Sequence, residues 1–230
     1  MMQRIPGLFI TGTDTGVGKT YVAAIIARRL VAEGRKVGVY KPAASGCSLS
    51  DGVLVSDDAV ALWNAADRPG QFDRVCPQCF AAPLAPHLAA LSEGRRLDAG
   101  RLRQGIEYWR ERSEIILVEG AGGLMSPLGE DEYVADLVEE FGFPLVVVAR
   151  NALGTINQTL QTLIAAAVFR GGLPIAGVVL NHPAIPAADD VSLSQNRGEL
   201  AARCVPPILA EVAWGGEEAD GKVDWFSLAR

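Results

Sequence analysis

The residue types from Gly12 to Thr20 are those that bind phosphate. The stretch reads Gly-Thr-Asp-Thr-Gly-Val-Gly-Lys-Thr and directly follows an apolar run that is expected to form the first strand. Small residues let consecutive backbone N–H groups converge on phosphate oxygens, and the start of the next helix adds partial positive charge. One additional residue separates its outer glycines compared with the common GxxxxGK[ST] loop, so the stretch is a variant of that pattern. A glycine-rich turn of purely structural use is the alternative, and the strand-to-helix context favours phosphate binding.

Two side chains at the end of this loop extend its chemistry. The ammonium group of Lys19 can reach the β- and γ-phosphates of a nucleotide, and the hydroxyl of Thr20 can bind Mg²⁺. A metal partner is then needed, and Glu119 follows a buried apolar run at 115–118. A solvated acid at a strand end is the alternative there. Asp57 and Asp58 open a predicted helix, where an acid serves equally well as a cap or as a metal ligand.

A lone lysine marks the end of the predicted second strand. Lys41 stands in Tyr40-Lys41-Pro42, with Ser45 just beyond, and the chain has only four lysines. In a doubly wound sheet this edge faces the ligand crevice, where a lysine can stabilise developing negative charge. An ordinary surface lysine at a strand end is the open alternative.

Two further segments could recognise a ligand. The segment Gly154–Asn157 follows a predicted strand and starts a helix, so its free N–H groups could bind a carboxylate, although helix capping explains these residues equally well. Asn181 ends another strand and could contact the edge of a base. The guanine-reading NKxD pattern is absent because His182-Pro183-Ala184 follows, which favours adenine.

The cysteines and histidines indicate no further chemistry. Cys76 and Cys79 form a single CxxC, and with His87 they offer three metal ligands where a structural zinc site needs four. Reduced thiols in a loop are the favoured interpretation. Neither His87 nor His182 accompanies a GxSxG serine, so a Ser-His-Asp hydrolase is not indicated.

Short apolar runs alternate with helix-length amphipathic segments along the chain. The runs are apolar at nearly every position, which is typical of parallel strands buried on both faces. The predicted strands are Gly7–Thr11, Lys36–Tyr40, Glu114–Val118, Pro144–Ala149, Ile175–Leu180 and, more weakly, Pro207–Leu209. The predicted helices are Lys19–Glu33, Asp57–Ala66, Ala99–Glu111, Asp131–Phe141, Gly154–Phe169 and Gln195–Cys204. We therefore expect an α/β fold, a doubly wound, mostly parallel sheet flanked by helices, in a single P-loop domain over residues 1–230. The stretches Pro69–Pro86 and Pro183–Asp190 are the longest irregular pieces.

Composition limits the classes of partner. The chain has 230 residues, of which 21 are Lys or Arg and 27 are Asp or Glu, giving a formal net charge of −6. This balance disfavours DNA as a partner. No apolar run approaches the roughly 20 residues of a membrane span, and Met1–Thr11 does not resemble a signal peptide. A cytoplasmic protein without a membrane partner is expected.

The motifs occur together in an order that resembles the dethiobiotin synthetase family. They are the phosphate loop, Tyr40-Lys41-Pro42 with Ser45-Gly46, the acids within Ser56–Ala59, Ala85-Pro86-His87, Val118–Gly123 with Pro127, Leu153–Asn157 and Val179-Leu180-Asn181. This resemblance covers nearly the whole chain, from about Phe9 to Trp214. The combination is specific, whereas the phosphate loop alone is not.

The resemblance implies an ATP- and Mg²⁺-dependent ligase of biotin synthesis. Members of that family convert 7,8-diaminopelargonate, CO₂ and ATP into dethiobiotin, ADP and phosphate. One amine captures CO₂ as a carbamate, the carbamate takes the γ-phosphoryl group to give a carbamic–phosphoric anhydride, and the second amine closes the cyclic urea. Family members are homodimers with the substrate near the subunit interface.

The resemblance also implies roles for the residues at matching positions. The implied catalytic residues are Thr15, Lys19 and Lys41. The implied Mg²⁺ ligands are Thr20, Asp58 and Glu119. The implied substrate contacts are Thr15, Ser45, Gly154, Thr155, Ile156 and Asn157. The implied ATP contacts are Gly16, Val17, Gly18, Lys19, Thr20, Tyr21, Asp58, Glu119, Gly120, Ala121, Gly122, Asn181, His182, Ala213 and Trp214.

The chain departs from the family pattern at two of these positions. Gly16 stands where some members carry glutamate, and Ala213 replaces a proline often found before the tryptophan.

The main alternative function is that of a switch ATPase. Switch ATPases of the partition or septum-site kind share the expected fold and a similar loop. They place a signature lysine near the loop start, where this chain has Asp14. A cobyrinate-amidating ligase usually carries a glutamine-hydrolysing domain, for which the chain has no room. The sequence thus favours the cyclising ligase.

Overall fold

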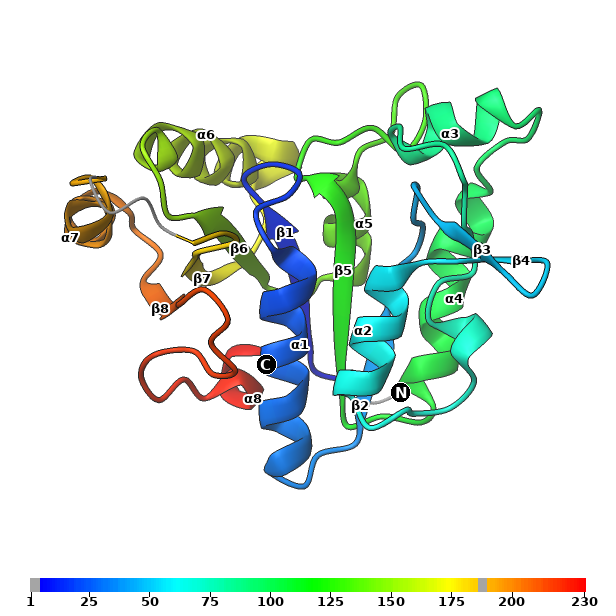
Figure 1. Cartoon of the computed structure of the whole chain (residues 1–230), viewed down its shortest axis with the longest axis horizontal. Coiled ribbons are helices and arrows are strands. Elements are labelled where there is room, and N and C mark those ends of the chain that lie inside the picture. The colour runs from blue at the N-terminus through cyan, green and yellow to red at the C-terminus, as the bar shows by residue number, and fades with distance from the viewer. Residues whose placement is uncertain (1–4, 186–189) are drawn as a thin grey trace.

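A parallel sheet forms the centre of the computed structural model, which describes residues 5–185 and 190–230 (Figure 1). Its 6 strands lie in the order β2-β5-β1-β6-β7-β8, and every neighbouring pair is parallel. The strands are β1 (Gly7–Gly12), β2 (Val37–Tyr40), β5 (Ile115–Gly123), β6 (Leu145–Arg150), β7 (Ile175–Asn181) and β8 (Ile208–Val212). The expected doubly wound α/β class is confirmed.

Helices cover both faces of the sheet because its strands are apolar on both sides. Every residue of β1 and β2 is buried. In Figure 1, α1 lies at the front next to β5, and α5 lies behind β5. The helices are α1 (Lys19–Ala32), α2 (Asp57–Ala65), α3 (Pro86–Ser92), α4 (Ala99–Arg110), α5 (Val134–Phe141), α6 (Thr155–Val168), α7 (Leu193–Arg203) and α8 (Trp225–Leu228). No helix in the described part of the chain is long and apolar enough to cross a membrane.

The expected strands are all present, and some elements were not anticipated. Strand β5 runs on to Gly123 because its glycine-rich end continues to pair, with Gly123 opposite Gly12 of β1. A small antiparallel hairpin joins β3 (Ser48–Ser50) to β4 (Val53–Val55). Its turn residues Asp51 and Gly52 both have positive φ, which is the signature of an Asp-Gly hairpin turn. Strands of three residues are too short for hydrophobic periodicity to reveal.

The stretch Pro69–Pro86 is mostly irregular, as expected, and its backbone pairs with the segment that follows β2. The N–H of Lys41 donates to Val75 O at 2.8 Å, and the N–H of Ala44 donates to Gln78 O at 2.9 Å. This pairing fixes the chain that follows β2. The second expected irregular stretch, Pro183–Asp190, includes residues 186–189, which lie outside the described residues, as do residues 1–4 of the N-terminal segment.

The strand order positions the site. Strand β1 lies between β5 and β6, and the chain proceeds to opposite sides of the sheet from this point. In open α/β sheets, ligands bind beyond the carboxyl ends of the strands at such a switch point. The phosphate loop leaves β1 there, Lys41 follows β2 there, and Glu119 lies within β5.

Candidate active site

The phosphate loop has the backbone shape that its glycines permit. Gly16 and Gly18 have φ of 74° and 90°, values that side-chain-bearing residues rarely adopt. A Cβ atom at Gly18 would lie 2.0 Å from Nδ2 of Asn181, whereas one at Gly16 would meet nothing within 4 Å. No side chain caps the start of α1. The first N–H groups of this helix are therefore available to an anion.

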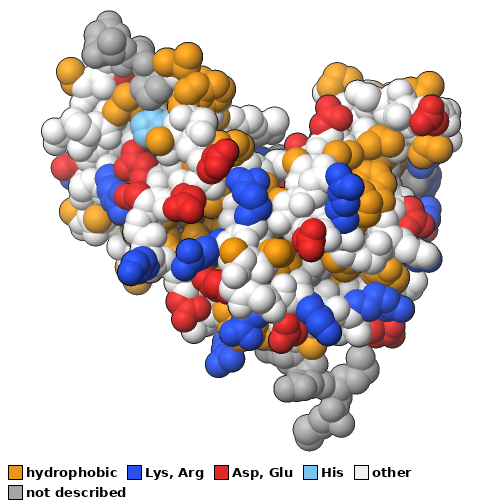
Figure 2. Space-filling model, turned by 60° about the horizontal axis from the view of Figure 1, so that its bottom comes forward, with side chains coloured by type: hydrophobic (Ala, Val, Ile, Leu, Met, Phe, Trp, Pro, Cys, Tyr) orange, Lys and Arg blue, Asp and Glu red, His pale blue; other side chains and the backbone are white. Residues whose placement is uncertain are grey.

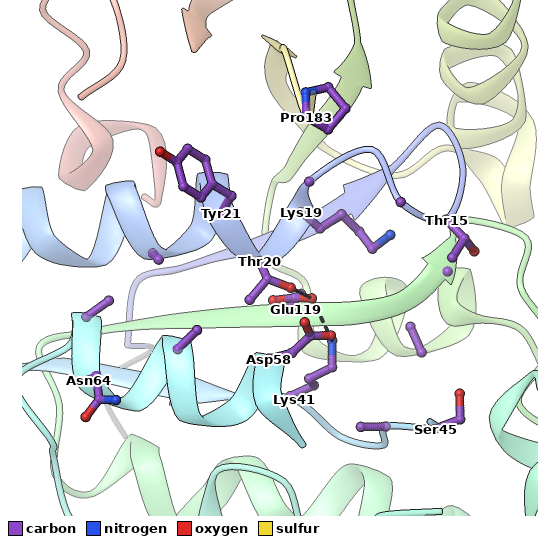
Figure 3. Close-up of a pocket in the computed structure, with 18 of the residues that line it drawn as sticks. Thr15, Lys19, Thr20, Tyr21, Lys41, Ser45, Asp58, Asn64, Glu119 and Pro183 are labelled. Carbon is purple, nitrogen blue, oxygen red and sulfur yellow. Dashed lines mark hydrogen bonds and ion pairs between the residues drawn. The ribbon is translucent and has the colours of Figure 1, made fainter. Parts of the chain in front are cut away.

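Opposite the loop, one buried lysine is held by two carboxylates (Figure 3). Nζ of Lys41 lies 2.6 Å from Oε1 of Glu119 and 2.8 Å from Oδ2 of Asp58. The hydroxyl of Thr20 donates to the same Glu119 oxygen at 2.8 Å. The side chains of Lys41 and Glu119 are 3% and 1% exposed, so neither is the surface residue that the sequence left open. Ser56, not Asp58, caps α2, because its hydroxyl accepts from the N–H of Ala59.

The charges of this cluster depend on one another. Burial by itself lowers the pKa of Lys41, but the carboxylates of Glu119 and Asp58 outweigh it and hold that pKa above its ordinary value. Burial by itself raises the pKa of Asp58. Lys41, together with Thr20 and Lys19, outweighs burial, so the pKa of Asp58 lies below its ordinary value. Lys41 is therefore a buried ammonium group at neutral pH.

Lys19 lies in a different electrostatic environment. Its ammonium group donates to the backbone oxygen of Asp14 at 3.1 Å. The pKa of Lys19 lies below its ordinary value. Burial lowers it most and the ammonium of Lys41 lowers it further, while the carboxylate of Glu119 raises it by less. The two lysines belong to different elements and extend into one site (Figure 3).

A cavity of about 880 Å³ brings most of the predicted site residues together. The predicted residues that line it are Thr15, Gly16, Gly18, Lys19, Thr20, Tyr21, Lys41, Ser45, Asp58, Glu119, Ala121 and Gly122. It is also lined by residues that were not predicted, namely Ala24, Arg28, Ala44, Ala61, Asn64, Ala65 and Pro183. Five of these lie on α1 and α2, at spacings of three or four residues within each helix, and only the packing of the two helices brings them together.

Other predicted residues do not line the cavity. Nδ2 of Asn181 donates to Val17 O at 2.8 Å, and Oδ1 of Asn181 is buried without a hydrogen-bond partner. The ring of His182 is directed at Glu211, with Nε2 2.7 Å from Oε1. The remaining residues of this kind are Val17, Gly120, Ala213 and Trp214.

The helix start Gly154–Asn157 is also absent from the cavity lining. Gly154 has φ of 95°, and no side chain caps α6, so capping does not account for this segment. The N–H of Thr155 donates to Ala152 O at 3.1 Å, and those of Ile156 and Asn157 remain available to an anion.

The donors at the lysine cluster suit a hard cation that also contacts phosphate. Oε2 of Glu119 is buried without a hydrogen-bond partner, and Thr20 and Asp58 face the same carboxylate. Mg²⁺ is usually held by one or two carboxylates together with substrate phosphates. Among residues 5–185 and 190–230, no group of three or more His, Cys, Asp or Glu side chains could hold a metal by itself. Cys76 and Cys79 are free thiols, 3.7 Å apart.

Comparison with known proteins identifies the family. The family model described as an AAA domain matches residues 6–217. The ATP-dependent dethiobiotin synthetase BioD of Rhodopirellula baltica is 42% identical over 215 residues, covering 89% of this chain and 82% of the relative. That of Anaeromyxobacter dehalogenans strain 2CP-C is 42% identical over 208 residues, covering 90% of each. This chain belongs to the dethiobiotin synthetase family. One cavity of this dethiobiotin synthetase-family chain is lined by Lys19, Lys41, Asp58 and Glu119.

Solved structures of other P-loop proteins share the fold of this synthetase-family chain. A ParA family ATPase from Chlorobium tepidum aligns with a TM-score of 0.53 at 17% identity, over 90% of this chain and 83% of that one. The signal recognition particle receptor FtsY from Elizabethkingia anophelis aligns with the same TM-score at 12% identity; the chain spans 62% of its length. These similarities show the P-loop fold alone.

Proposed function

We propose that this protein is an ATP-dependent dethiobiotin synthetase of biotin biosynthesis. It closes the ureido ring of dethiobiotin from 7,8-diaminopelargonate and CO₂ and releases ADP and phosphate. One observation carries the proposal beyond family membership: a single cavity is lined by the phosphate loop and, opposite it, by the buried Lys41 of a second strand. We further propose that residues 1–230 act as one ligase domain in the cytoplasm, where ATP and the diamine are available.

The reaction needs charge neutralisation and positioning, with no nucleophile from the protein. One amine of the diamine attacks CO₂ and loses a proton, giving a carbamate. A carbamate oxygen then attacks the γ-phosphorus, and ADP leaves. The second amine attacks the carbon of the resulting anhydride, and the C–O bond breaks to release phosphate. Negative charge develops on phosphoryl oxygens at each late step, and fixed cations stabilise it.

The described side chains match these requirements. The loop N–H groups and Lys19 hold the phosphates, with the ammonium of Lys19 next to the γ-phosphate. Lys41 approaches from the opposite side and stabilises the carbamate and its phosphorylated form. Thr15 and Ser45, which line the same cavity, orient the carbamate. Pro183 lines the cavity beside Asn181, whose unpaired oxygen suits the amino group of adenine.

We assign Mg²⁺ to Thr20, Asp58 and Glu119. The orphaned Oε2 of Glu119 and the hydroxyl of Thr20 supply the hard oxygen donors that this ion prefers. When bound, Mg²⁺ would neutralise charge on the β- and γ-phosphates. Because Lys41 contacts Oε1 of Glu119 and Oδ2 of Asp58, its ammonium holds both carboxylates in place and leaves Oε2 of Glu119 for the ion.

The proposed activity is tested by substrate dependence. Purified protein should release ADP only when ATP, Mg²⁺, the diamine and a CO₂ source are all present, and mass spectrometry should detect dethiobiotin. Steady ATP hydrolysis without the diamine, stimulated by DNA or lipid vesicles, would contradict the proposal and favour a switch ATPase. On the face shown in Figure 2, basic and acidic side chains are interspersed, with no basic patch for a polyanion.

The metal assignment predicts the behaviour of Glu119→Gln. The substitution retains the size of the side chain but removes the charge that would hold Mg²⁺. We expect the Mg²⁺ concentration for half-maximal activity to rise at least about tenfold, since a lost charge-assisted contact costs more than about 1.4 kcal/mol. Titration of activity with Mg²⁺ at saturating substrates measures this shift. An unchanged Mg²⁺ requirement would show that Glu119 is not a ligand. Glu114→Gln, just before β5, is the matched control.

We propose that the enzyme is a homodimer in which the start of α6 receives the substrate carboxylate. The N–H groups of Ile156 and Asn157, which no side chain caps, suit a carboxylate but lie outside the cavity lining of one chain. Leu153, just before α6, and Ile164 and Val168, further along it, are 86%, 62% and 71% exposed. A second subunit would cover these apolar residues. A monomeric mass by sedimentation at assay concentration would contradict this proposal.

A further inference from the structure

A partly buried polar cluster joins the carboxyl ends of β6, β7 and β8 beside the phosphate loop. We call it the Glu211 cluster; its members are Asn151, His182, Asn196 and Glu211. Nε2 of His182 lies 2.7 Å from Oε1 of Glu211, and Nδ2 of Asn151 donates to the same oxygen at 2.8 Å. Nδ2 of Asn196 donates to Oδ1 of Asn151 at 2.8 Å. Because a carboxylate only accepts, Nε2 of His182 is the protonated nitrogen of this contact.

The Glu211 cluster fixes His182, and the residues on either side of it, Asn181 and Pro183, contact the nucleotide site. On one side, Nδ2 of Asn181 donates to Val17 O in the phosphate loop at 2.8 Å. On the other side, Pro183 lines the cavity. The ring of His182 points away from the cavity to Glu211, so its hydrogen bond fixes the backbone between two nucleotide-facing residues.

The strand that carries Glu211 also leads into the segment that follows β8. Glu211 lies two residues before Ala213 and Trp214, and the N–H of His182 donates to Val212 O at 3.0 Å. Further along, the hydroxyl of Tyr21 on α1 donates to Gly216 O at 2.8 Å. The two segments expected to flank the base are therefore joined by the backbone hydrogen bond from His182 to Val212 and by the contact of His182 with Glu211. Tyr21 ties the loop just after Trp214 to α1.

We propose that Glu211 is a positioning residue for the nucleotide. Glu211 does not line the cavity. Through His182 it fixes the segment Asn181–Pro183 relative to the segment Ala213–Trp214, so that a base fits between them. This inference rests on the proposed ATP-dependent function. Removing the carboxylate leaves the two segments joined by backbone hydrogen bonding without the side-chain link, and the lost order must be restored when the nucleotide binds. The loss therefore falls on nucleotide affinity, with the chemical step between Lys19 and Lys41 spared.

The test is the kinetic and binding behaviour of Glu211→Ala. We expect KM for ATP to rise at least about fivefold, because hydrogen bonds from two donors to a charged acceptor are lost. Calorimetric Kd for ATP should rise by the same factor. Turnover at saturating ATP and KM for the diamine should stay within about twofold of wild type, since uniform binding alone is removed.

Two further variants separate positioning from general stability. Glu211→Gln keeps an acceptor oxygen and should restore most of the ATP affinity. Glu199→Ala, which removes an exposed ion pair with Arg203 on α7, is the matched control and should leave every parameter unchanged. If Glu211→Ala does not fold, His182→Ala should show the same selective rise in KM for ATP.

The outcomes distinguish this inference from the proposed function. An unchanged KM for ATP in folded Glu211→Ala would overturn the inference, as would an equal loss of turnover and affinity for both substrates, which indicates a structural role alone. If wild-type protein makes no dethiobiotin, the proposed function fails, and the calorimetric Kd still decides whether Glu211 positions a nucleotide.

Discussion

Lys41→Gln should lower turnover at least about tenfold, because losing one preorganised electrostatic contact to the transition state costs a few kcal/mol. The ammonium group that it removes is 3% exposed and lies between Glu119 and Asp58. Glutamine can still donate a hydrogen bond to Glu119 but brings no charge to the carbamate. The measurement is kcat and KM for ATP and the diamine at saturating Mg²⁺.

The same substitution should also destabilise the folded protein. Breaking a buried ion pair by removing one partner costs up to about 3–5 kcal/mol, because the other charge stays buried without compensation. The double variant Lys41→Gln/Glu119→Gln removes both charges and should recover stability in urea unfolding without recovering turnover. Lys36→Gln, at the other end of the strand that precedes Lys41, is exposed and serves as the control. Unchanged kcat and KM in Lys41→Gln would remove this lysine from the site.

Gly18→Ala should reduce ATP affinity at least about tenfold, the equivalent of about 1.4 kcal/mol. The added Cβ would lie 2.0 Å from Nδ2 of Asn181, which donates to Val17 O in the same loop. Alanine must in addition adopt the φ of 90° that Gly18 has, a conformation costing about 1–2 kcal/mol for L-residues. Asn181 or the loop must therefore move, and the N–H groups leave the positions that hold phosphate.

Gly16→Ala separates these two costs. Gly16 also has positive φ, at 74°, but nothing lies within 4 Å of its added Cβ. It should lose only the part of the affinity due to backbone strain. Calorimetry with Mg²⁺ and ATP compares the variants, and circular dichroism checks that both are folded. Wild-type affinity in Gly18→Ala, or equal losses in the two variants, would show that the contact with Asn181 does not shape the loop.

The elements of the fold and most residues of the cavity were predictable from local patterns. Fully apolar runs predicted the parallel strands because burial on both faces removes the polar alternation. The glycine-rich turn between a strand and a helix predicted the phosphate loop, since its chemistry resides in the backbone. The β3–β4 hairpin and α3 were missed because elements this short carry too little periodicity.

What the sequence by itself determined is the fold class, the phosphate loop and the kinds of polar side chain at strand ends. Only the tertiary structure decided that Lys41, Asp58 and Glu119 form one cluster, that α6 starts outside the cavity, and that His182 binds Glu211. The physical reason is that residue pattern encodes local burial and backbone freedom. Contact between Lys41 and Glu119, 78 positions apart, depends on the adjacency of β2 and β5 in the sheet.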